Sequence, residues 1–397
     1  MISGIVIKNF KCLKSVDLKL KRITVFIGPN GSGKTSIFQA LLTLKNFVIK
    51  YGNIQHSQIF NLDFVNLGDP TQVSYLKGSY PVSIGMCIND IAEYSISIHQ
   101  NRLNSQLSIF LDKNHSWTLN RTIPLPYTSK SSTLHDLTIN SKVYKMQWDG
   151  LLRLKLQSKQ PPPPSQALGK LLNSIQKLEK CVKNIYYIPY YKHGFIRSLW
   201  PLQSIKIEQC FIVPEEYVVN LFINPDFEDY FMEVSKEIFN RTIRQFSKPN
   251  AIELIVRLKK GKTIGISNEG GGLNRVTYIL GVIIGVPKDS CILLEEPETN
   301  LHPKAQYNLP TYLVELSKEY DKQILITTHS EHILYGFLDC IRKKILKLDD
   351  FVIYYLNKEE LETKVKSLEI DEKGRVKGGL PGFFEENIHE LIAALEG

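Results

Sequence analysis

The feature that most constrains this chain of 397 residues is a glycine-rich turn at residues 28–35, Gly-Pro-Asn-Gly-Ser-Gly-Lys-Thr. It follows the apolar run of residues 23–27 and opens residues 36–44, whose apolar positions recur at helical spacing. The turn therefore lies between a buried strand and a helix start, which is the context of a P-loop. Its glycines let several backbone N–H groups point inward, where they bind phosphate oxygens together with the positive helix end. The alternative is a glycine-rich turn that binds no nucleotide.

The turn also carries side chains suited to a nucleotide. Lys34 supplies a charge for the β- and γ-phosphates, and the hydroxyl of Thr35 is a magnesium ligand. We therefore expect ATP and Mg²⁺ as cofactors. The expected phosphate-binding set is Asn30, Gly31, Ser32, Gly33, Lys34, Thr35 and Ser36.

Composition limits the class of protein. A hydrophobic content of 43% over 397 residues can form the core of one large or two moderate domains. No apolar stretch reaches about 18 residues, and the first residues lack the apolar core of a signal peptide. We expect a cytoplasmic protein with no membrane partner. The cysteines are scattered without a C-x-x-C pair, which argues against a disulfide framework or a zinc site.

The net charge of +9 is unevenly distributed. Residues 1–50 hold nine Lys or Arg against Asp17, and residues 142–192 hold ten against Asp149 and Glu179. A local basic face attracts polyanions whatever the total charge, so these stretches form a candidate nucleic-acid face. A solvated lysine-rich surface is the open alternative.

Hydrophobic periodicity outlines the rest of the chain. Two strand patterns precede the P-loop, and residues 74–156 contain short alternating runs that predict an inserted antiparallel β-subdomain. Pro161–Pro164 marks a stiff spacer before a basic amphipathic helix at residues 168–178, and residues 214–247 are predicted to be mostly helical. Beyond residue 252 an α/β pattern resumes, so we expect the two ends of the chain to share one parallel sheet.

These patterns give five segments. We expect 1–70 as the N-terminal part of an ATPase core, 71–160 as the β-subdomain, 161–250 as a spacer with a helical arm, 251–350 as the C-terminal part of the core, and 351–397 as C-terminal strands and tail. In the tail, residues 371–384 predict a hairpin turn followed by an aromatic-tipped loop.

Two further strand patterns each end in polar residues suited to catalysis, at the edge of the sheet where we expect the nucleotide to bind. The apolar run 291–294 ends in Glu295 and Glu296, and the run 323–328 ends at His329. Glu295 is placed to hold magnesium, Glu296 to accept a proton from the attacking water, and His329 to bond the γ-phosphate or the water. Taken alone, paired acids are mostly a helix start and a lone histidine is mostly structural. Together with a P-loop in one chain they favour catalysis.

Several of these segments together resemble the ABC-type ATPase heads of the SMC/RecF/OLD-like group of prokaryotic ATPases. The resemblance rests on residues 9–11, the P-loop, Ser267–Arg275, Glu295–Pro303 and Thr328–Ser330. It implies an α/β P-loop NTPase head of mixed and parallel sheet, with the inserted antiparallel β-subdomain and a helical region.

In this family the glycine-rich segment 267–275 is the signature motif, which completes the nucleotide site of the opposite protomer. The resemblance implies roles in nucleotide binding for Ser267, Gly270, Gly272 and Asn274. Gly270–Gly272 precede the apolar helix 276–284, where backbone N–H groups can meet a phosphate. The alternative is a flexible hairpin.

The chain departs from the family in three places. The signature lacks the usual Ser-Gly-Gly, so the γ-phosphate contact stays open between Ser267, Asn268 and Asn274. No arginine follows Pro189, where Lys192 or Arg197 could substitute. A Q-loop glutamine is not assignable, and Gln55 and Gln58 are candidates only by position.

The resemblance implies an ATP-hydrolysing switch that acts as a head-to-tail homodimer or higher oligomer. Proteins of this kind serve as ATPase subunits in anti-phage defence and control a separate effector such as a nuclease. The alternatives are a DNA-bound ATPase of repair or chromosome maintenance, a nucleotide-dependent scaffold with negligible turnover, and a transporter subunit. The acidic-strand motif fits the transporter poorly.

Overall fold

The structure is a computed structural model that describes residues 1–49, 59–89, 91–110, 116–125, 133–139, 142–149, 152, 154–157, 166–258 and 261–377. The chain divides into two compact units. The first unit comprises 1–20, 32–185 and 358–364, and the second comprises 21–31, 186–357 and 365–397. The division runs through the P-loop, since Gly31 belongs to the second unit and Ser32 to the first.

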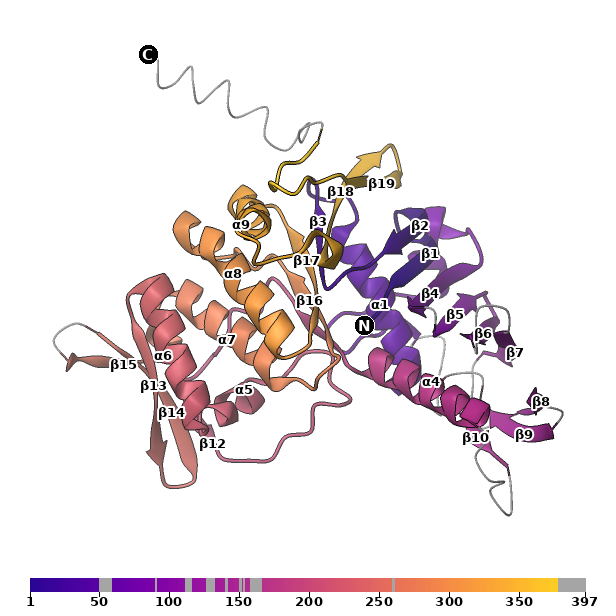
Figure 1. The fold of residues 1–397 in the computed structure, drawn as a ribbon, viewed down its shortest axis with the longest axis horizontal. Coiled ribbons are helices and arrows are strands. Elements are labelled where there is room, and N and C mark those ends of the chain that lie inside the picture. The colour runs from indigo at the N-terminus through magenta and orange to yellow at the C-terminus, as the bar shows by residue number, and fades with distance from the viewer. Residues whose placement is uncertain are drawn as a thin grey trace, which may run out of the picture. The chain divides into compact units, whose positions relative to one another are not determined.

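A six-stranded antiparallel sheet forms the first unit (Figure 1). Its order is β2 (Leu13–Lys19), β1 (Gly4–Phe10), β4 (Val82–Ile88), β5 (Ala92–Ile98), β6 (Arg102–Phe110) and β7 (Ser116–Pro124). The predicted antiparallel runs therefore continue the sheet of the N-terminal hairpin. Buried and exposed residues alternate along these strands, as expected when only one face is covered.

Two helices pack on the strands of this sheet. Helix α1 (Lys34–Ile49) contacts β1 and β4, and α4 (Gln166–Lys183) contacts β5 and β6. The apolar stripe predicted for α4 is buried at Leu168, Leu171, Ile175 and Leu178. Lys45 of α1 is also buried, and its Nζ donates a 2.6 Å hydrogen bond to the carbonyl of Ile185. The proline spacer, Gln55 and Gln58 lie outside the described residues.

The first unit also contains short elements. They are α3 (Pro70–Val73), η1 (Tyr75–Lys77) and a separate antiparallel sheet of β10 (Leu154–Leu156), β9 (Lys142–Trp148) and β8 (Thr133–Ile139).

The central sheet of the second unit joins strands from distant parts of the chain. Its order is β11 (Ile185–Ile188), β16 (Cys291–Glu295), β17 (Gln323–Thr328), β3 (Ile23–Ile27), β18 (Phe351–Glu359) and β19 (Glu362–Leu368). Strand β3 runs parallel to both β17 and β18. The prediction that the two ends of the chain share a parallel sheet is confirmed.

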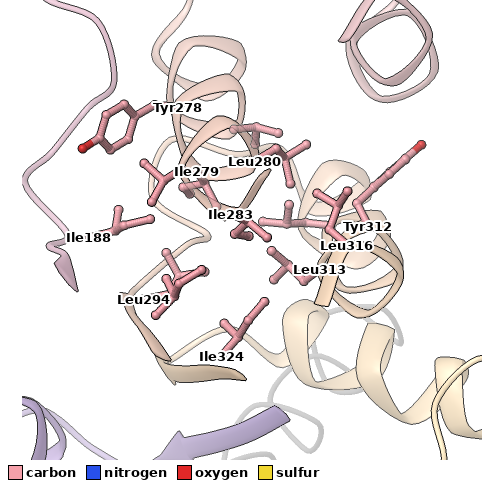
Figure 2. Close-up of a cluster of buried hydrophobic side chains, with 14 of the residues drawn as sticks. Ile188, Tyr278, Ile279, Leu280, Ile283, Leu294, Tyr312, Leu313, Leu316 and Ile324 are labelled. Atoms are coloured by element: carbon pink, nitrogen blue, oxygen red, sulfur yellow. The ribbon is translucent and has the colours of Figure 1, made fainter. Parts of the chain in front are cut away.

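Helices α7 (Gly271–Gly285), α8 (Pro303–Glu319) and α9 (Glu331–Arg342) form a layer beside strands β16 and β17 (Figure 1). Figure 2 shows the core between them, where Ile279 and Ile283 of α7 and Leu313 of α8 point toward Leu294 and Ile324 of the strands. Every residue of β16 and β17 is buried, which explains why their central residues are all apolar.

A second sheet of this unit consists of β12 (Leu199–Pro201), β14 (Ala251–Arg257) and β13 (Thr242–Lys248), with β15 (Thr263–Gly265) also paired to β14. Helices α5 (Glu215–Leu221) and α6 (Pro225–Phe239) precede it, so the helical prediction for residues 214–247 is wrong at β13. Asn240 ends α6 in the left-handed conformation with φ of 53°. Asparagine tolerates that conformation, which stops a helix.

The remaining elements of the second unit are η3 (Ile266–Asn268), η4 (Leu348–Asp350) and a C-terminal turn. Ile370 bridges Val376 across that turn, which confirms the predicted hairpin, and the aromatic-tipped part lies outside the described residues. Among the described residues, no helix combines the length and hydrophobicity that a bilayer crossing requires.

Candidate functional site

Three parallel strands of the second unit end level with one another. Ile27 of β3 pairs with Thr328 of β17, and Thr327 pairs with Glu295 of β16. The first half of the P-loop, His329 and Glu296 therefore all leave the same edge of the sheet. The carboxyl edge of parallel strands is where α/β proteins bind ligands.

Glu295 is held at this edge with 3% of its surface exposed. Its Oε2 accepts a 2.5 Å hydrogen bond from the Tyr187 hydroxyl and a 3.4 Å hydrogen bond from the N–H of Tyr190. Burial, followed by the charge of Glu295, raises the pKa of Tyr187 far above its usual range. Tyr187 is thus a neutral donor to the carboxylate, and sequence reasoning missed it.

Glu296 is turned away from its neighbour into a more open position. Its φ of +43° lies in the left-handed region, which is uncommon for a residue with a side chain. Its Oε1 lies 3.5 Å from His329 Nε2, and the two side chains are 34% and 31% exposed. Strained backbone at paired polar groups is typical of functional sites. The structure therefore brings together the predicted base and the predicted histidine.

Glu298 fixes the segment that carries His329. Its Oε1 accepts 2.8 Å hydrogen bonds from the Thr328 hydroxyl and from the backbone N–H of His329. Its Oε2 is buried and has no hydrogen-bond partner among the described residues. Burial raises the pKa of Glu298 above its usual value.

Arg275 is completely buried beside the acidic strand and was not assigned a role from the sequence. Its guanidinium donates to the carbonyls of Glu295 at 2.7 Å and Glu296 at 3.1 Å. It also donates to the carbonyls of Tyr190 at 3.0 Å and Lys192 at 2.5 Å. Burial lowers the pKa of Arg275 to about 10, while the nearby glutamates oppose that shift. A charged residue directly before the apolar run 276–284 was the available sequence signal.

The signature segment splits into an exposed start and a buried continuation. Gly270 is the N-cap of α7, is exposed, and has open space where a side chain would stand. Gly272 is buried, and a Cβ there would lie 2.7 Å from the carbonyl oxygen of Asn300. The first turn of a helix has N–H groups without intrahelical partners, so this start can bind an anion.

Two other predicted signature residues are engaged within the chain. Asn274 is 6% exposed, accepts a 2.6 Å hydrogen bond from the N–H of Phe195 and donates to the carbonyl of Phe195 at 2.9 Å. The hydroxyl of Ser267 lies 2.7 Å from that of Ser198. Both side chains position the segments around α7 in this structure.

The candidate substitutes for the missing family arginine are likewise paired. Lys192 forms an ion pair with Glu215, and its Nζ lies 5.2 Å from the ring centroid of Tyr278. Arg197 pairs with Glu216.

The second half of the P-loop, residues 32–35, belongs to the first unit. Thr363 donates a 2.9 Å hydrogen bond to the carbonyl of Ser32, and the N–H of Ser36 donates to Gly33 at 3.0 Å. Gly33 has φ of +100°, and a Cβ there would lie 2.7 Å from the Thr363 hydroxyl and 2.8 Å from Cys12 Sγ. A glycine is required at this position. Thr363 follows Ser32 by 331 positions, so sequence spacing could not reveal the contact.

Lys34 begins α1 with 6% of its surface exposed, and Thr35 follows in the first turn. Asn30 and Gly31 are exposed in the second unit. The Ser32 hydroxyl is buried without a hydrogen-bond partner among the described residues. An unsatisfied buried hydroxyl in a phosphate-binding turn fits a site completed by a ligand.

The donor set also fits magnesium delivered with a nucleotide. Within the described ranges no three His, Cys, Asp or Glu side chains could hold a metal by themselves. Mg²⁺ commonly uses one or two carboxylates and takes its other ligands from phosphates and water. Glu295, a carboxylate at the strand edge of the second unit, matches that requirement.

Comparison with known proteins decides the family. The sequence profile of the AAA ATPase domain matches residues 1–208 and 223–334. The chain belongs to the AAA ATPase domain family. An OLD nuclease from Thermus scotoductus (strain ATCC 700910 / SA-01) is 23% identical over 419 residues, spanning 99% of this chain and 70% of that protein.

Solved structures show a similar architecture. An SMC head bound to the C-winged helix domain of ScpA is 13% identical, with a TM-score of 0.50 and coverage of 93% of this chain and 98% of that one. The SMC head domain from Thermotoga maritima is 12% identical, with a TM-score of 0.43 and coverage of 93% and 99%.

The expected fold is confirmed as a P-loop NTPase α/β fold of mixed sheets and helices. The chain is an ATPase of the SMC/RecF/OLD-like type, and its family is a nucleotide-binding one.

Proposed function

We propose that this AAA ATPase domain protein hydrolyses ATP with Mg²⁺, using the strand edge where residues 28–31, Glu295, Glu296 and His329 meet. The single observation that carries the proposal is the level ending of β3, β17 and β16 in one parallel sheet. Residues 30–36 bind the phosphates, with Lys34 as their counter-charge. Thr35 and Glu295 hold the ion, which neutralises charge on the β- and γ-phosphates when bound.

Glu296 and His329 act on the water that attacks the γ-phosphate. Glu296 accepts a proton from it, because its carboxylate is partly exposed and is separate from the buried Glu295. His329 lies 3.5 Å from Glu296 and orients the water or bonds the γ-phosphate. Glu298 and Arg275 act through the backbone, by holding the segments that carry these side chains.

We infer that the working form is a head-to-tail homodimer or a higher oligomer. The exposed start of α7 at Gly270 supports this inference, because its N–H groups can complete a nucleotide site from outside. The buried Gly272, Asn274 and Arg275 behind it give that start a firm base.

We place the ATPase in a prokaryotic anti-phage defence complex, where it controls a separate effector such as a nuclease. The similarity to a protein named OLD nuclease supports a link to nucleic-acid processing.

The exposed lysines of the predicted arm give less support to a DNA-bound repair ATPase. On α4, Lys170, Lys177 and Lys180 are exposed, while Lys183 forms a 2.6 Å ion pair with Glu179. No aromatic residue occurs in this helix, so it matches a solvated lysine face.

The proposal is tested with Glu296→Gln, which keeps the shape of the side chain and removes the base. We expect turnover of ATP to fall by about 100-fold or more. The variant should keep its ATP bound, and light scattering should show that it stays in the proposed dimer or higher oligomer. Glu372→Gln, in the exposed C-terminal turn, is the control and should behave as wild type. Unchanged hydrolysis in Glu296→Gln would remove the base assignment.

A further inference from the structure

The four-stranded sheet of the second unit has one covered face and one open face. Ile243, Ile252, Leu254 and Val256 point into the core and are at most 2% exposed. Because side chains alternate along a strand, the residues between them point outward. The outward set is Arg244, Phe246 and Lys248 on β13, Glu253, Ile255 and Arg257 on β14, and Leu199 and Pro201 on β12.

This open face carries an uncompensated positive charge. Lys248 forms a 2.6 Å ion pair with Glu253, which leaves Arg244 and Arg257. Both arginines are exposed, and neither has an ion-pair partner in the part of the chain that the structure describes. In the register Arg244 lies opposite Ile255, so Arg257 is its diagonal neighbour at about 7–8 Å. Two like charges at this spacing favour an anion bound between or beside them.

An exposed aromatic ring adjoins the arginines. Phe246 follows Arg244 by two residues on β13, lies on the same face and is 55% exposed. Glu253 of β14 pairs with Phe246 on one side and with Leu199 of β12 on the other, and Leu199 is 46% exposed. An apolar ring left in water beside free guanidinium groups offers a stacking surface as well as charge.

We propose that the outer face of this sheet binds single-stranded nucleic acid, with Arg244 and Arg257 on the phosphate backbone and a base stacked on Phe246. Arginine groups and aromatic rings on a sheet are the combination used to bind unpaired strands without sequence preference. A duplex hides its bases from such stacking, so a single strand fits better. An acidic peptide would use the arginines but would leave Phe246 without a matching group.

The face is linked to the signature segment of the same unit. β15 leads directly into η3, and Ser198, which precedes β12, bonds Ser267 at 2.7 Å. Arg241, just before β13, forms a 3.5 Å ion pair with Glu269. A strand bound to this face would therefore contact elements bonded directly to the start of α7. The proposal goes beyond ATP hydrolysis and does not depend on it.

The test is fluorescence anisotropy of the full chain with a labelled 20-nucleotide single strand of mixed sequence, as DNA and as RNA. Tight binding of either the DNA strand or the RNA strand by the wild-type protein supports the proposal. The double variant Arg244→Ala/Arg257→Ala should bind at least 10-fold more weakly. Its slope of log affinity against log salt should shrink by about 1.4, because each phosphate contact on a single strand contributes about 0.7. Phe246→Ala should weaken binding by about 5-fold or more with little change in slope.

The matched control is Lys170→Ala/Lys177→Ala on α4, which removes the same charge from a face without aromatics and should bind as wild type. The proposal is overturned if the arginine variant binds as tightly as wild type, or if the lysine variant loses as much. It is also overturned if duplex DNA binds as tightly as the single strand. A change of oligomeric state in the arginine variant without loss of binding would assign the face to a second copy instead.

Discussion

The hydroxyl of Tyr187 donates a 2.5 Å hydrogen bond to Oε2 of Glu295, from the strand next to it in the central sheet. On the backbone side, Arg275 donates to the carbonyl of the same glutamate at 2.7 Å. The expected magnesium ligand is therefore fixed at both its side chain and its main chain before any ion arrives. Groups that orient a metal ligand commonly change metal affinity 10- to 100-fold when removed.

Tyr187→Phe removes this donor and keeps the ring. We expect the Mg²⁺ concentration for half-maximal ATP hydrolysis to rise about 10-fold, with a smaller change in the rate at saturating Mg²⁺. Mn²⁺ binding in the presence of ATP, followed by electron paramagnetic resonance, should weaken in parallel. Tyr217→Phe is the control, because it loses a 2.6 Å hydrogen bond to Gly285 away from the acidic strand. Equal Mg²⁺ requirements in the two variants would argue that Tyr187 only supports the fold.

The sequence was sufficient to predict the middle of the central sheet because strands β3, β16 and β17 are short, mostly apolar runs. Residues 23–27, 291–295 and 323–328 are all buried and mostly apolar, and polar residues gather where β16 and β17 end. The end of a strand is visible in the sequence, so the meeting of residues 28–31, Glu296 and His329 could be predicted.

The groups that hold those residues could not be predicted, because their contacts are remote in sequence. Tyr187 reaches Glu295 across 108 positions and Thr363 reaches Ser32 across 331. Periodicity carries no information about such pairs. The missed strand β13 differs, since Asn240 is a residue type that tolerates the left-handed conformation and was therefore a local sequence signal that helix α6 ends.

Substitutions at Gly272 and Gly270 distinguish a packing role from a nucleotide-binding role in the signature segment. Gly272→Ala would place a Cβ 2.7 Å from the carbonyl oxygen of Asn300, so we expect a loss of about 1–3 kcal/mol in the free energy of unfolding. Gly270→Ala meets nothing within 4 Å, but alanine is a poorer N-cap than glycine, so we expect a smaller loss of at most about 1 kcal/mol.

The proposed dimer adds a second expectation for Gly270→Ala. Its ATP-dependent association should weaken by more than the small loss of stability explains, because a methyl group added at the exposed start of α7 obstructs a phosphate that binds there. Urea unfolding and light scattering with ATP measure the two effects. Normal association in Gly270→Ala would contradict the inferred contact at the start of α7.

Glu298 gives the stability of the nucleotide-free protein a pH dependence. Burial raises its pKa in the folded state, so the folded state binds this proton more tightly than the unfolded state does. Stability contributed by this group therefore falls as pH rises from the usual carboxyl value through the raised value. Glu298→Gln should raise the unfolding temperature at pH 8, and the gain should shrink toward pH 4. Glu372→Gln, in an exposed turn, should show neither effect. A gain for Glu298→Gln that is the same at both pH values would exclude titration as its cause.

Thr363 is expected to keep the P-loop in a phosphate-binding shape. It is 2% exposed, and its hydroxyl donates to the carbonyl of Ser32 at 2.9 Å. Thr363→Val keeps the volume but leaves that buried carbonyl without its donor, which costs about 1–3 kcal/mol. Because the loop can relieve this cost by moving, affinity for a fluorescent ATP analogue should fall about 5-fold or more. Thr363→Ser retains the hydroxyl and should restore binding. If the valine and serine variants bind the analogue equally well, the shape of the loop does not depend on this hydrogen bond.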